Sequence, residues 1–510
     1  SAVVCMKIKS AAAGQVIRVR HAEVLVGGEL FTSNLRKAEA NIVYTCREGE
    51  QEFTPELTTM GFRYVRVQGV KPENLEITAQ VVSSLGTPTG GFSCSNELLN
   101  QLQDNIQWGA RSNFVDIPTD CPQREKNGWT GDGHFAIETA LYNYDGITVY
   151  EKWLADHRDE QQPNGVLPDI IPTGGWGYGT DNGLDWTSTI AIIPWNIYMF
   201  YGDHKLLADC YENIKRYVDY VDRTSPTGLT SWGRGDWVPV KSHSSKELTS
   251  SVYFYVDTKI LANAAKMFNK TEDYKYYSAL ANKIKNAIND KFLNRETGIY
   301  GSGVQTEQSV PLQWGIVPEE LKRKVARNLA KQVEAAGFHL DVGVLGAKAI
   351  LNALSENGEA ETAYKLAAQD TYPSWGCWIA NGATTLLENW DLNATRDISD
   401  NHMMFGEIGG WFYKGLGGIF PDPENPGFKH ILLRPNFPSG LNEFEARYQS
   451  PYGEICSKWE RKKNRIVYHV TVPANSTATF YAPDNVKGER AVNLEAGKHI
   501  LELPIKRAVY

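Results

Sequence analysis

The sequence has few of the features of a disulfide-stabilised or zinc-dependent protein. Its 510 residues include seven cysteines, which stand singly and never form a Cys-x-x-Cys pair. An odd number of isolated cysteines argues against a disulfide framework and against a zinc site, because both need grouped thiols. We therefore expect buried thiols.

Long apolar runs and basic clusters are also missing. No apolar run reaches the roughly 18 residues that suggest a membrane span. The net charge is −8 and no run of Lys or Arg could follow a polyanion, which argues against a nucleic-acid partner. The Gly-x-Ser-x-Gly motif of many serine hydrolases is absent as well. We expect neither a membrane span nor a nucleic-acid surface.

The beginning of the chain carries no recognisable targeting signal. It starts at Ser1 without an initiator Met, and no basic segment is followed there by an apolar core. Such a start is typical of a processed or trimmed chain. We expect a periplasmic or extracellular location in preference to the cytoplasm.

What the sequence does contain is a clear change of hydrophobic period along its length. A chain of 510 residues exceeds one ordinary core, so two or three domains are expected. Apolar and polar residues alternate at 16–21, 42–46 and 62–68, with Gly-rich or Glu-rich turns between them. This alternation predicts half-buried strands. We assign residues 1–90 to part of an N-terminal β-sandwich.

From residue 91 the period is that of helices. Leu98, Leu102, Ile106 and Ala110 recur every four residues, and Ser95 is a candidate N-cap. About a dozen short helical patterns continue to residue 420, which favours an (α/α)6 toroid. A helical solenoid is the alternative, although no repeat of fixed period supports it. Helical patterns cover 211–221, 252–268, 274–292, 321–335, 343–354 and 358–368.

Strand patterns return after Pro421 and predict a second β-sandwich over 421–510. The expected fold class is therefore multidomain, with an (α/α)6 toroid flanked by antiparallel β-sandwich domains. The predicted C-terminal strands are 430–435, 444–448, 453–459, 465–472 and 477–481.

The segment 120–132, Asp-Cys-Pro-Gln-Arg-Glu-Lys-Asn-Gly-Trp-Thr-Gly-Asp, is the most informative stretch of the chain. Its proline and two glycines predict an irregular loop. Three carboxylates close together cost energy unless protons, cations or hydroxyl donors relieve them. A sugar bound by the carboxylates and stacked on the indole would do so. An acidic surface loop and a calcium loop are the alternatives, but the acids lack the spacing of an EF-hand.

This segment resembles the signature of glycoside hydrolase family 78, the inverting α-L-rhamnosidases, in which DCPQR is followed by an acid and then GWTGD. The β–α–β order of the chain is similar to that family too. The resemblance implies that Glu125 is the general acid and that Asp120, Arg124 and Asp132 bind the sugar. Many members carry two acids after the arginine, whereas this chain has Glu-Lys. The distance to Trp129 places Glu125 at the acid position.

Hydrolysis of a glycoside needs a second carboxylate. Glu388 lies in 381–391, which we interpret as an apolar helical run, and Glu407 lies in 401–411. The first segment resembles the family's Ala-Thr-Thr…Glu-x-Trp stretch, which bears the general base, and the second resembles its Asn-His stretch. We predict Glu388 as the base, with Glu407 as the alternative. A structural carboxylate paired with a basic residue is the other interpretation of Glu388.

Tryptophans recur between Gly, Asp or Pro residues at 183–186, 235–237 and 373–378. We expect a rim of exposed indoles, which would suit a sugar with an apolar face, although packing in a core is the other interpretation. The resemblance implies that the pocket is lined by Trp129, Trp186, Trp237 and His402, with Trp375 and Trp390 as weaker matches.

The resemblance implies an exo-acting α-L-rhamnosidase that inverts configuration. We expect no organic cofactor and assign no metal-ligating residues, and the content of structural metal ions is left open. Its partner would be a rhamnose-containing glycoside or polysaccharide. Another (α/α)6 glycosidase, a glycoside phosphorylase and a catalytically inactive carbohydrate-binding protein are the alternatives. The aglycone and the oligomeric state are left open.

Overall fold

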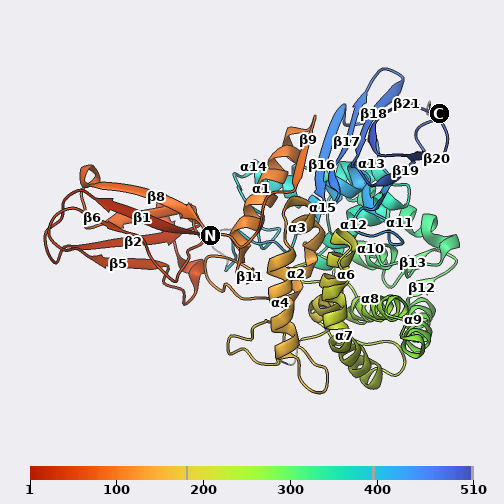
Figure 1. The fold of residues 1–510 in the computed structure, drawn as a ribbon, viewed down its shortest axis with the longest axis horizontal. Coiled ribbons are helices and arrows are strands. Elements are labelled where there is room, and N and C mark those ends of the chain that lie inside the picture. Colours follow the sequence, from red (N-terminus) through yellow and green to blue (C-terminus); the bar gives the residue numbers. More distant parts are fainter. Residues whose placement is uncertain (180–181, 393–396, 507–510) are drawn as a thin grey trace.

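Strands, helices and strands follow one another along the chain, as the sequence predicts (Figure 1). The computed structural model describes residues 1–179, 182–392 and 397–506. The N-terminal strands form a lobe at one end of the molecule, whereas the helices and the C-terminal strands lie together on the other side (Figure 1). None of the described helices is both long enough and apolar enough to cross a membrane.

The N-terminal lobe consists of two three-stranded sheets, with strand orders β6-β1-β8 and β5-β2-β7. Alternate residues of β2 (Val16–Ala22) are buried, so that Ile17 and Val19 point into the space between the sheets. These residues belong to an apolar cluster separate from the core of the helices. The other elements are β1 (Ala2–Ile8), β3 (Val24–Val26), β4 (Glu29–Phe31), η1 (Ser33–Leu35), β5 (Asn41–Thr45), β6 (Gln51–Phe53), β7 (Tyr64–Gln68), η2 (Pro72–Asn74) and β8 (Leu75–Val81).

The helices form an inner and an outer set. In α8 (Lys246–Met267) most residues are buried, and in α12 (Val344–Glu356) all but one are, as expected for helices surrounded by others. In α7 (Lys205–Thr224) and α9 (Thr271–Phe292) only one face is buried, and both pack against α8. The remaining helices are α1 (Glu97–Asn113), α2 (Thr130–Phe135), α3 (Ile137–Asn143), α4 (Ile147–Glu160), α5 (Leu184–Thr187), α6 (Thr189–Tyr201), α10 (Gln305–Gln313), η3 (Glu319–Leu321), α11 (Lys322–Ala335), α13 (Ala360–Ala367), α14 (Trp375–Ala380), α15 (Ile408–Trp411) and η4 (Phe412–Leu416).

The start of the first helix differs from its prediction. The N-cap of α1 is Asn96, whose side chain accepts a hydrogen bond from the Leu98 amide, so the assignment of Ser95 was wrong. The Ser95 hydroxyl instead accepts a hydrogen bond at 2.9 Å from the amide of Asn442 in the C-terminal domain. Both residue types can cap a helix, and the strand pairing just before Ser95 decides between them.

The C-terminal domain contains a five-stranded sheet, β21-β18-β17-β16-β9, and a four-stranded sheet, β14-β15-β19-β20. Strand β9 (Gly90–Cys94) comes from the start of the helical region and pairs with β16 (Glu443–Ser450), with Cys94 opposite Phe444. In the second sheet β15 pairs with β19 in parallel, an exception to the antiparallel pattern. The other strands are β14 (Ile419–Pro421), β15 (His430–Leu433), β17 (Gly453–Arg461), β18 (Arg465–Val472), β19 (Thr477–Tyr481), β20 (Ala491–Leu494) and β21 (Gly497–Pro504); the short hairpins β10 (Phe114–Val115)–β11 (Ile117–Pro118) and β12 (Leu293–Asn294)–β13 (Ile299–Tyr300) lie between helices.

Because the N-terminal lobe has its own core, a cavity made there should destabilise the lobe and leave the helices unchanged. Ile17 is completely buried, and we expect Ile17→Ala to reduce the free energy of unfolding of the lobe by about 2–5 kcal/mol. Ile77→Ala in β8, where the side chain is 39% exposed, is the matched control and should cost far less. Hydrogen–deuterium exchange along a urea series, compared between β1 and α8, measures both effects. Equal acceleration in α8 would contradict the separation of the two cores.

Candidate active site

The loop that begins at Asp120 is closed by its own hydrogen bonds. The Asp120 amide donates to the Asn127 carbonyl at 3.0 Å, and the Asn127 amide donates to Asp120 Oδ1 at 2.8 Å. The buried Cys121 thiol donates to Asp120 Oδ2 at 2.9 Å. The segment is not irregular throughout, however. It enters helix α2 at Thr130, so Asp132 projects from a helix and the loop prediction was wrong for the last three residues.

Glu388 lies in a loop, so the helix predicted over 381–391 was wrong. Helix α14 ends at Ala380, and Gly382 adopts a φ of +85° that is unfavourable for other residues. The Glu388 amide then donates to the Ser399 carbonyl at 3.0 Å, and the Ser399 amide donates to Glu388 Oε2 at 2.6 Å. Leu386 is fully buried although it is not helical, and burial of this kind produced the misleading pattern.

Arg124 connects the two glutamates that the sequence singles out. Its side chain is 2% exposed. Nη2 donates to Glu388 Oε2 at 2.9 Å, and Nε lies 3.7 Å from Glu125 Oε1. Nη1 lies 2.5 Å from Asp397 Oδ1 and also donates to the Asn34 carbonyl at 3.1 Å. Residues that are far apart in the sequence therefore meet at one guanidinium group.

Asp132 and His402 form the buried floor beside these carboxylates. Asp132 Oδ1 lies 3.2 Å from His402 Nδ1. Burial, with the Asp120 carboxylate as a further cause, raises the pKa of Asp132 well above its usual range. Burial also raises the pKa of Asp120 to about 7, and it lowers the pKa of His402 to about 3. The floor thus contains a neutral imidazole and carboxyl groups that hold protons at higher pH than usual.

Two atoms of this cluster lack a hydrogen-bond partner among the described residues. They are Asp132 Oδ1, with which the neighbouring His402 Nδ1 forms no hydrogen bond, and Arg124 Nε, and both are buried. A buried polar atom without a partner is costly. One is an oxygen and the other an N–H donor, so an alcohol group could satisfy either. In the same described part of the chain, no three His, Cys, Asp or Glu side chains are grouped as metal ligands would be.

The aromatic residues only partly form the predicted rim. Trp129 Nε1 donates to Glu125 Oε2 at 3.1 Å, and the Arg234 guanidinium lies 4.9 Å from the Trp129 ring. Arg234 also lies 5.9 Å from the ring of Trp186, which is buried. Trp237 is 49% exposed and follows Arg234 along the same loop. Trp129 therefore brings indole surface to the cluster, and Arg234 connects it to Trp186.

For the segment 373–378 the prediction of exposed indoles was wrong. Trp375, Trp378 and Trp390 are buried. Trp375 Nε1 donates to the Phe405 carbonyl at 3.1 Å, and Trp390 Nε1 donates to the Val342 carbonyl at 2.9 Å. Indoles whose N–H groups find internal acceptors can be buried without penalty, and these belong to the core of the helical domain.

Glu407, the alternative base, belongs to a different buried cluster. Its carboxylate lies 3.6 Å from Lys348 Nζ and 3.9 Å from Lys414 Nζ, and Lys414 also pairs with Glu138 at 2.5 Å. Burial raises the pKa of Glu407 to about 8. Lys348 donates to the backbone carbonyl of His134 at 3.1 Å, at the end of helix α2. These contacts hold helix α2 in place, so this cluster has a structural role.

Four residues that contact the cluster could not be predicted from the sequence. Glu23 and Arg36 come from the N-terminal lobe, Asp397 from the segment after Glu388, and Arg234 from the loop before α8. Each is a single charged residue without a motif around it. Glu23 is buried, accepts a hydrogen bond from the Asp400 amide at 3.0 Å, and lies 3.3 Å from the Ser399 hydroxyl.

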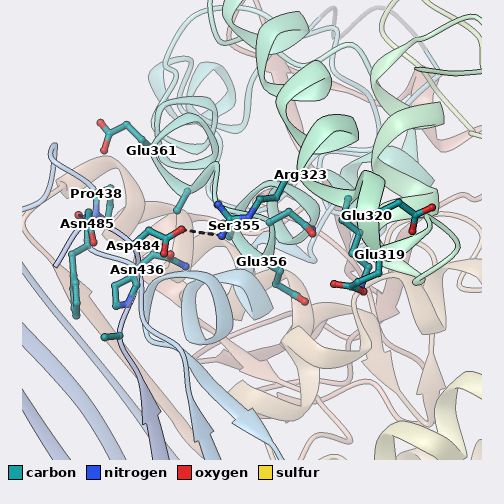
Figure 2. A pocket seen from close by; sticks show the side chains of 17 residues that line it. Glu319, Glu320, Arg323, Ser355, Glu356, Glu361, Asn436, Pro438, Asp484 and Asn485 are labelled. Carbon is teal, nitrogen blue, oxygen red and sulfur yellow. Dashed lines mark hydrogen bonds and ion pairs between the residues drawn. The ribbon is translucent and has the colours of Figure 1, made fainter. Parts of the chain in front are cut away.

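A hollow of about 670 Å³ between the helices and the C-terminal sandwich lies elsewhere (Figure 2). Arg323 and Asp484 form an ion pair at 3.1 Å across it (Figure 2). Both side chains are more than half exposed, and none of the residues predicted from the sequence as catalytic or sugar-binding lines this hollow. We therefore place the candidate active site at Arg124.

Comparison with known proteins identifies the family. The model of the bacterial α-L-rhamnosidase six-hairpin glycosidase domain matches residues 87–416, which is more than half of the chain. The chain belongs to the bacterial α-L-rhamnosidase family. The family's C-terminal domain matches residues 418–497, and its concanavalin-like domain matches residues 1–84. The predicted six-hairpin toroid with flanking β domains is thereby confirmed.

Relatives in this family are substantially longer. An α-L-rhamnosidase of Streptomyces avermitilis is 33% identical over 92% of this chain and 46% of its own length. One of Formosa agariphila is 33% identical over 94% of this chain and 54% of its own. The chain thus spans about half the length of the curated relatives it matches.

Solved structures agree with the assignment. The α-L-rhamnosidase of Dictyoglumus thermophilum is similar with a TM-score of 0.91 and 35% identity, over 99% of this chain and 60% of that chain. The S. avermitilis α-L-rhamnosidase in complex with L-rhamnose has a TM-score of 0.89 and 32% identity, over 99% of this chain and 50% of that chain.

The burial of Glu23 predicts a specific dependence of stability on pH. Burial raises its pKa from 4.5 to about 8. Between these values the folded protein holds a proton that the unfolded chain has lost, so stability falls as the pH rises through this window. Glu23→Gln removes this contribution. We expect the melting temperature of the variant to rise relative to wild type between pH 5 and pH 8, by the equivalent of a few kcal/mol at about 1.4 kcal/mol per pKa unit.

The control for this comparison is Glu52→Gln in the same lobe, where the side chain is 74% exposed. Its melting temperature should keep a constant difference from wild type across the same pH range. If Glu23→Gln also keeps a constant difference, the buried carboxyl group is not protonated as proposed.

Proposed function

We propose that this chain forms the catalytic part of an α-L-rhamnosidase that releases terminal α-L-rhamnose from glycosides with inversion of configuration. The observation that carries the proposal is the shared contact of Arg124 with Glu125 and Glu388. The two carboxylates contact different nitrogens of one guanidinium group. Their separation therefore cannot exceed the sum of the two contact distances and the width of that group. This bound overlaps the ~6.5–9.5 Å separation of inverting glycosidases.

Glu125 is the proposed general acid. In an inverting reaction the acid gives its proton to the glycosidic oxygen as the bond from the anomeric carbon to that oxygen breaks. The bonding electrons remain on the departing oxygen, and Glu125 becomes a carboxylate. Trp129 Nε1, which donates to Glu125 Oε2, fixes the orientation of this carboxyl group.

Glu388 is the proposed general base. It removes a proton from a water that attacks the anomeric carbon from the opposite side of the ring. Burial raises the pKa of Glu388, whereas Arg124 opposes that rise. A carboxyl group whose pKa is raised takes up a proton more readily, which suits this role. Glu407, held between two lysines, is the less suitable candidate.

In this proposal the buried floor and the indoles bind the sugar. Asp120, Asp132 and Arg124 offer acceptors and donors to ring hydroxyls, and the neutral His402 adds a polar edge. Rhamnose is a 6-deoxy sugar, so its methyl group needs apolar surface, which Trp129 and the neighbouring Trp186 and Trp237 provide. The proposed substrates are therefore rhamnose-containing glycosides or polysaccharides.

The two glutamates can be separated by the leaving group. An acid is needed most when the departing alcohol is poor, and least for a nitrophenolate that leaves unaided. We expect Glu125→Gln to lose on the order of a hundredfold in kcat/KM on an alkyl rhamnoside and much less on the nitrophenyl rhamnoside. Glu388→Gln should lose activity on both substrates about equally, because water must be activated in either case.

Glu407→Gln is the control for the choice of base. It should lose stability, because the contacts of its carboxylate with Lys348 and Lys414 are weakened, and it should retain turnover in the fraction that folds. A nearly wild-type Glu388→Gln together with an inactive, folded Glu407→Gln would transfer the role of base to Glu407.

The proposed inversion makes a prediction about the stereochemical course. A single displacement by water should release the β-anomer of L-rhamnose first. Proton NMR during the first minutes of hydrolysis distinguishes the anomers before mutarotation. First release of the α-anomer would require a covalent intermediate and would refute the assignment of Glu388 as a base.

A further inference from the structure

A turn of the N-terminal lobe extends into the candidate active site. The short helix η1 is followed by Arg36, and the whole turn lies against the catalytic domain. The Asn34 carbonyl accepts a hydrogen bond from Arg124 Nη1 at 3.1 Å, and the Asn34 amide group donates to the Ile398 carbonyl at 3.2 Å. Both Asn34 and Leu35 are buried. This turn is therefore fixed in place at the site.

Arg36 binds the proposed acid directly. Its Nη1 lies 2.5 Å from Glu125 Oε1, and its Nε lies 2.6 Å from Asp397 Oδ2. Asp397 Oδ1 in turn pairs with Arg124, which pairs with Glu388. Charges of opposite sign thus alternate from one proposed catalytic glutamate to the other. This series contains five charged groups, and two of them are guanidinium groups. Of these two, Arg36 is the one outside the helical domain.

The backbone at Arg36 is in an unfavourable conformation. Its φ is +53° and its ψ is −113°, a region that residues with a Cβ atom rarely adopt. Such a conformation persists only where its surroundings impose it, and it is frequent at functional sites. Glycine would adopt it without strain but would contribute no guanidinium group. The position therefore carries an arginine in spite of the strain.

We propose that Arg36 is a positioning residue that holds Glu125 for proton transfer and stabilises the carboxylate that the transfer leaves. This inference rests on the proposed function. As the proton passes from Glu125 to the glycosidic oxygen, negative charge develops on the carboxylate. The guanidinium group of Arg36, already fixed by Asp397, stabilises that charge and holds the carboxyl group towards the leaving oxygen. The N-terminal lobe therefore takes part in the departure of the leaving group.

An exposed ion pair without a catalytic effect is the competing explanation. Surface ion pairs contribute little, and the Arg36 side chain is 45% exposed. Its partner Glu125 is only 17% exposed, however, and Arg36 holds two carboxylates at once. Arg66 of the same lobe pairs with Glu29, with both side chains exposed and no contact with the site, and so provides a matched control.

The experiment measures kcat/KM for aryl and alkyl α-L-rhamnosides that differ in the acidity of the leaving alcohol. Wild type is compared with Arg36→Gln, Arg36→Lys, Arg36→Gly and Arg66→Gln. We expect Arg36→Gln to lose on the order of tenfold on the alkyl rhamnoside, a part of the ~10²–10⁴-fold that a general acid contributes. The loss on the nitrophenyl rhamnoside should be several times smaller, so the dependence on leaving-group acidity becomes steeper. Arg36→Lys should restore part of the loss, and Arg66→Gln should match wild type on every substrate.

Two further measurements separate this role from a structural one. The affinity for free L-rhamnose, measured by calorimetry, should not change in Arg36→Gln, because Arg36 acts through Glu125. Arg36→Gly should melt no lower than Arg36→Gln, because glycine relieves the backbone strain, although both lose activity alike.

Each of the following outcomes would overturn the inference. An equal loss on all substrates would assign Arg36 a structural role, and wild-type behaviour of Arg36→Gln would assign it none. If the wild-type protein releases no nitrophenol from the nitrophenyl rhamnoside, the proposed function is overturned, and the role of Arg36 with it. If the wild type is active but the variants keep its dependence on leaving-group acidity, the inference about Arg36 is refuted and the proposed function is not.

Discussion

The buried guanidinium group of Arg124 organises the candidate site. A charge out of contact with water is stable only when groups of opposite charge and hydrogen-bond acceptors surround it. Arg124 obtains them from Glu388 and Asp397, and from the carbonyl of Asn34. These partners come from two other parts of the chain, and the folded structure is what brings them together. The loop 120–132 supplies the residues of the family signature, but it cannot form the site alone.

The N-terminal lobe is joined to the site by polar groups and not by a common core. Its apolar cluster is separate, and its contacts with the helical domain include Glu23, Asn34 and Arg36. Arg63 adds a hydrogen bond of 2.9 Å to the Gly382 carbonyl at the start of the Glu388 loop. Polar contacts depend on geometry more strongly than apolar contacts do. The lobe can therefore influence the reacting groups while its own fold is maintained independently.

Patterns within one segment of the sequence predicted the structure well, whereas contacts between distant segments could not be predicted from it. The spacing from Glu125 to Trp129 placed Glu125 at the acid position of the motif, and the two side chains form a hydrogen bond. The change from period two to period four located the helical domain. Burial of Leu386 was mistaken for a helical face, because a loop packed on both sides produces a similar apolar run. Arg36 and Glu23 could not be predicted, since a single charge in a turn or strand has no local signature.

The strand β9 has a consequence for how the protein is made. Its partner β16 lies 350 positions later in the sequence, as the pairing of Cys94 with Phe444 shows. At about 5–20 residues per second, a ribosome needs roughly 20–70 s to synthesise the intervening chain. Throughout that time β9 has an unpaired edge, and such edges invite pairing with other chains. The nascent protein therefore depends on its first helices, or on a chaperone, to shield five residues until the last domain has been translated.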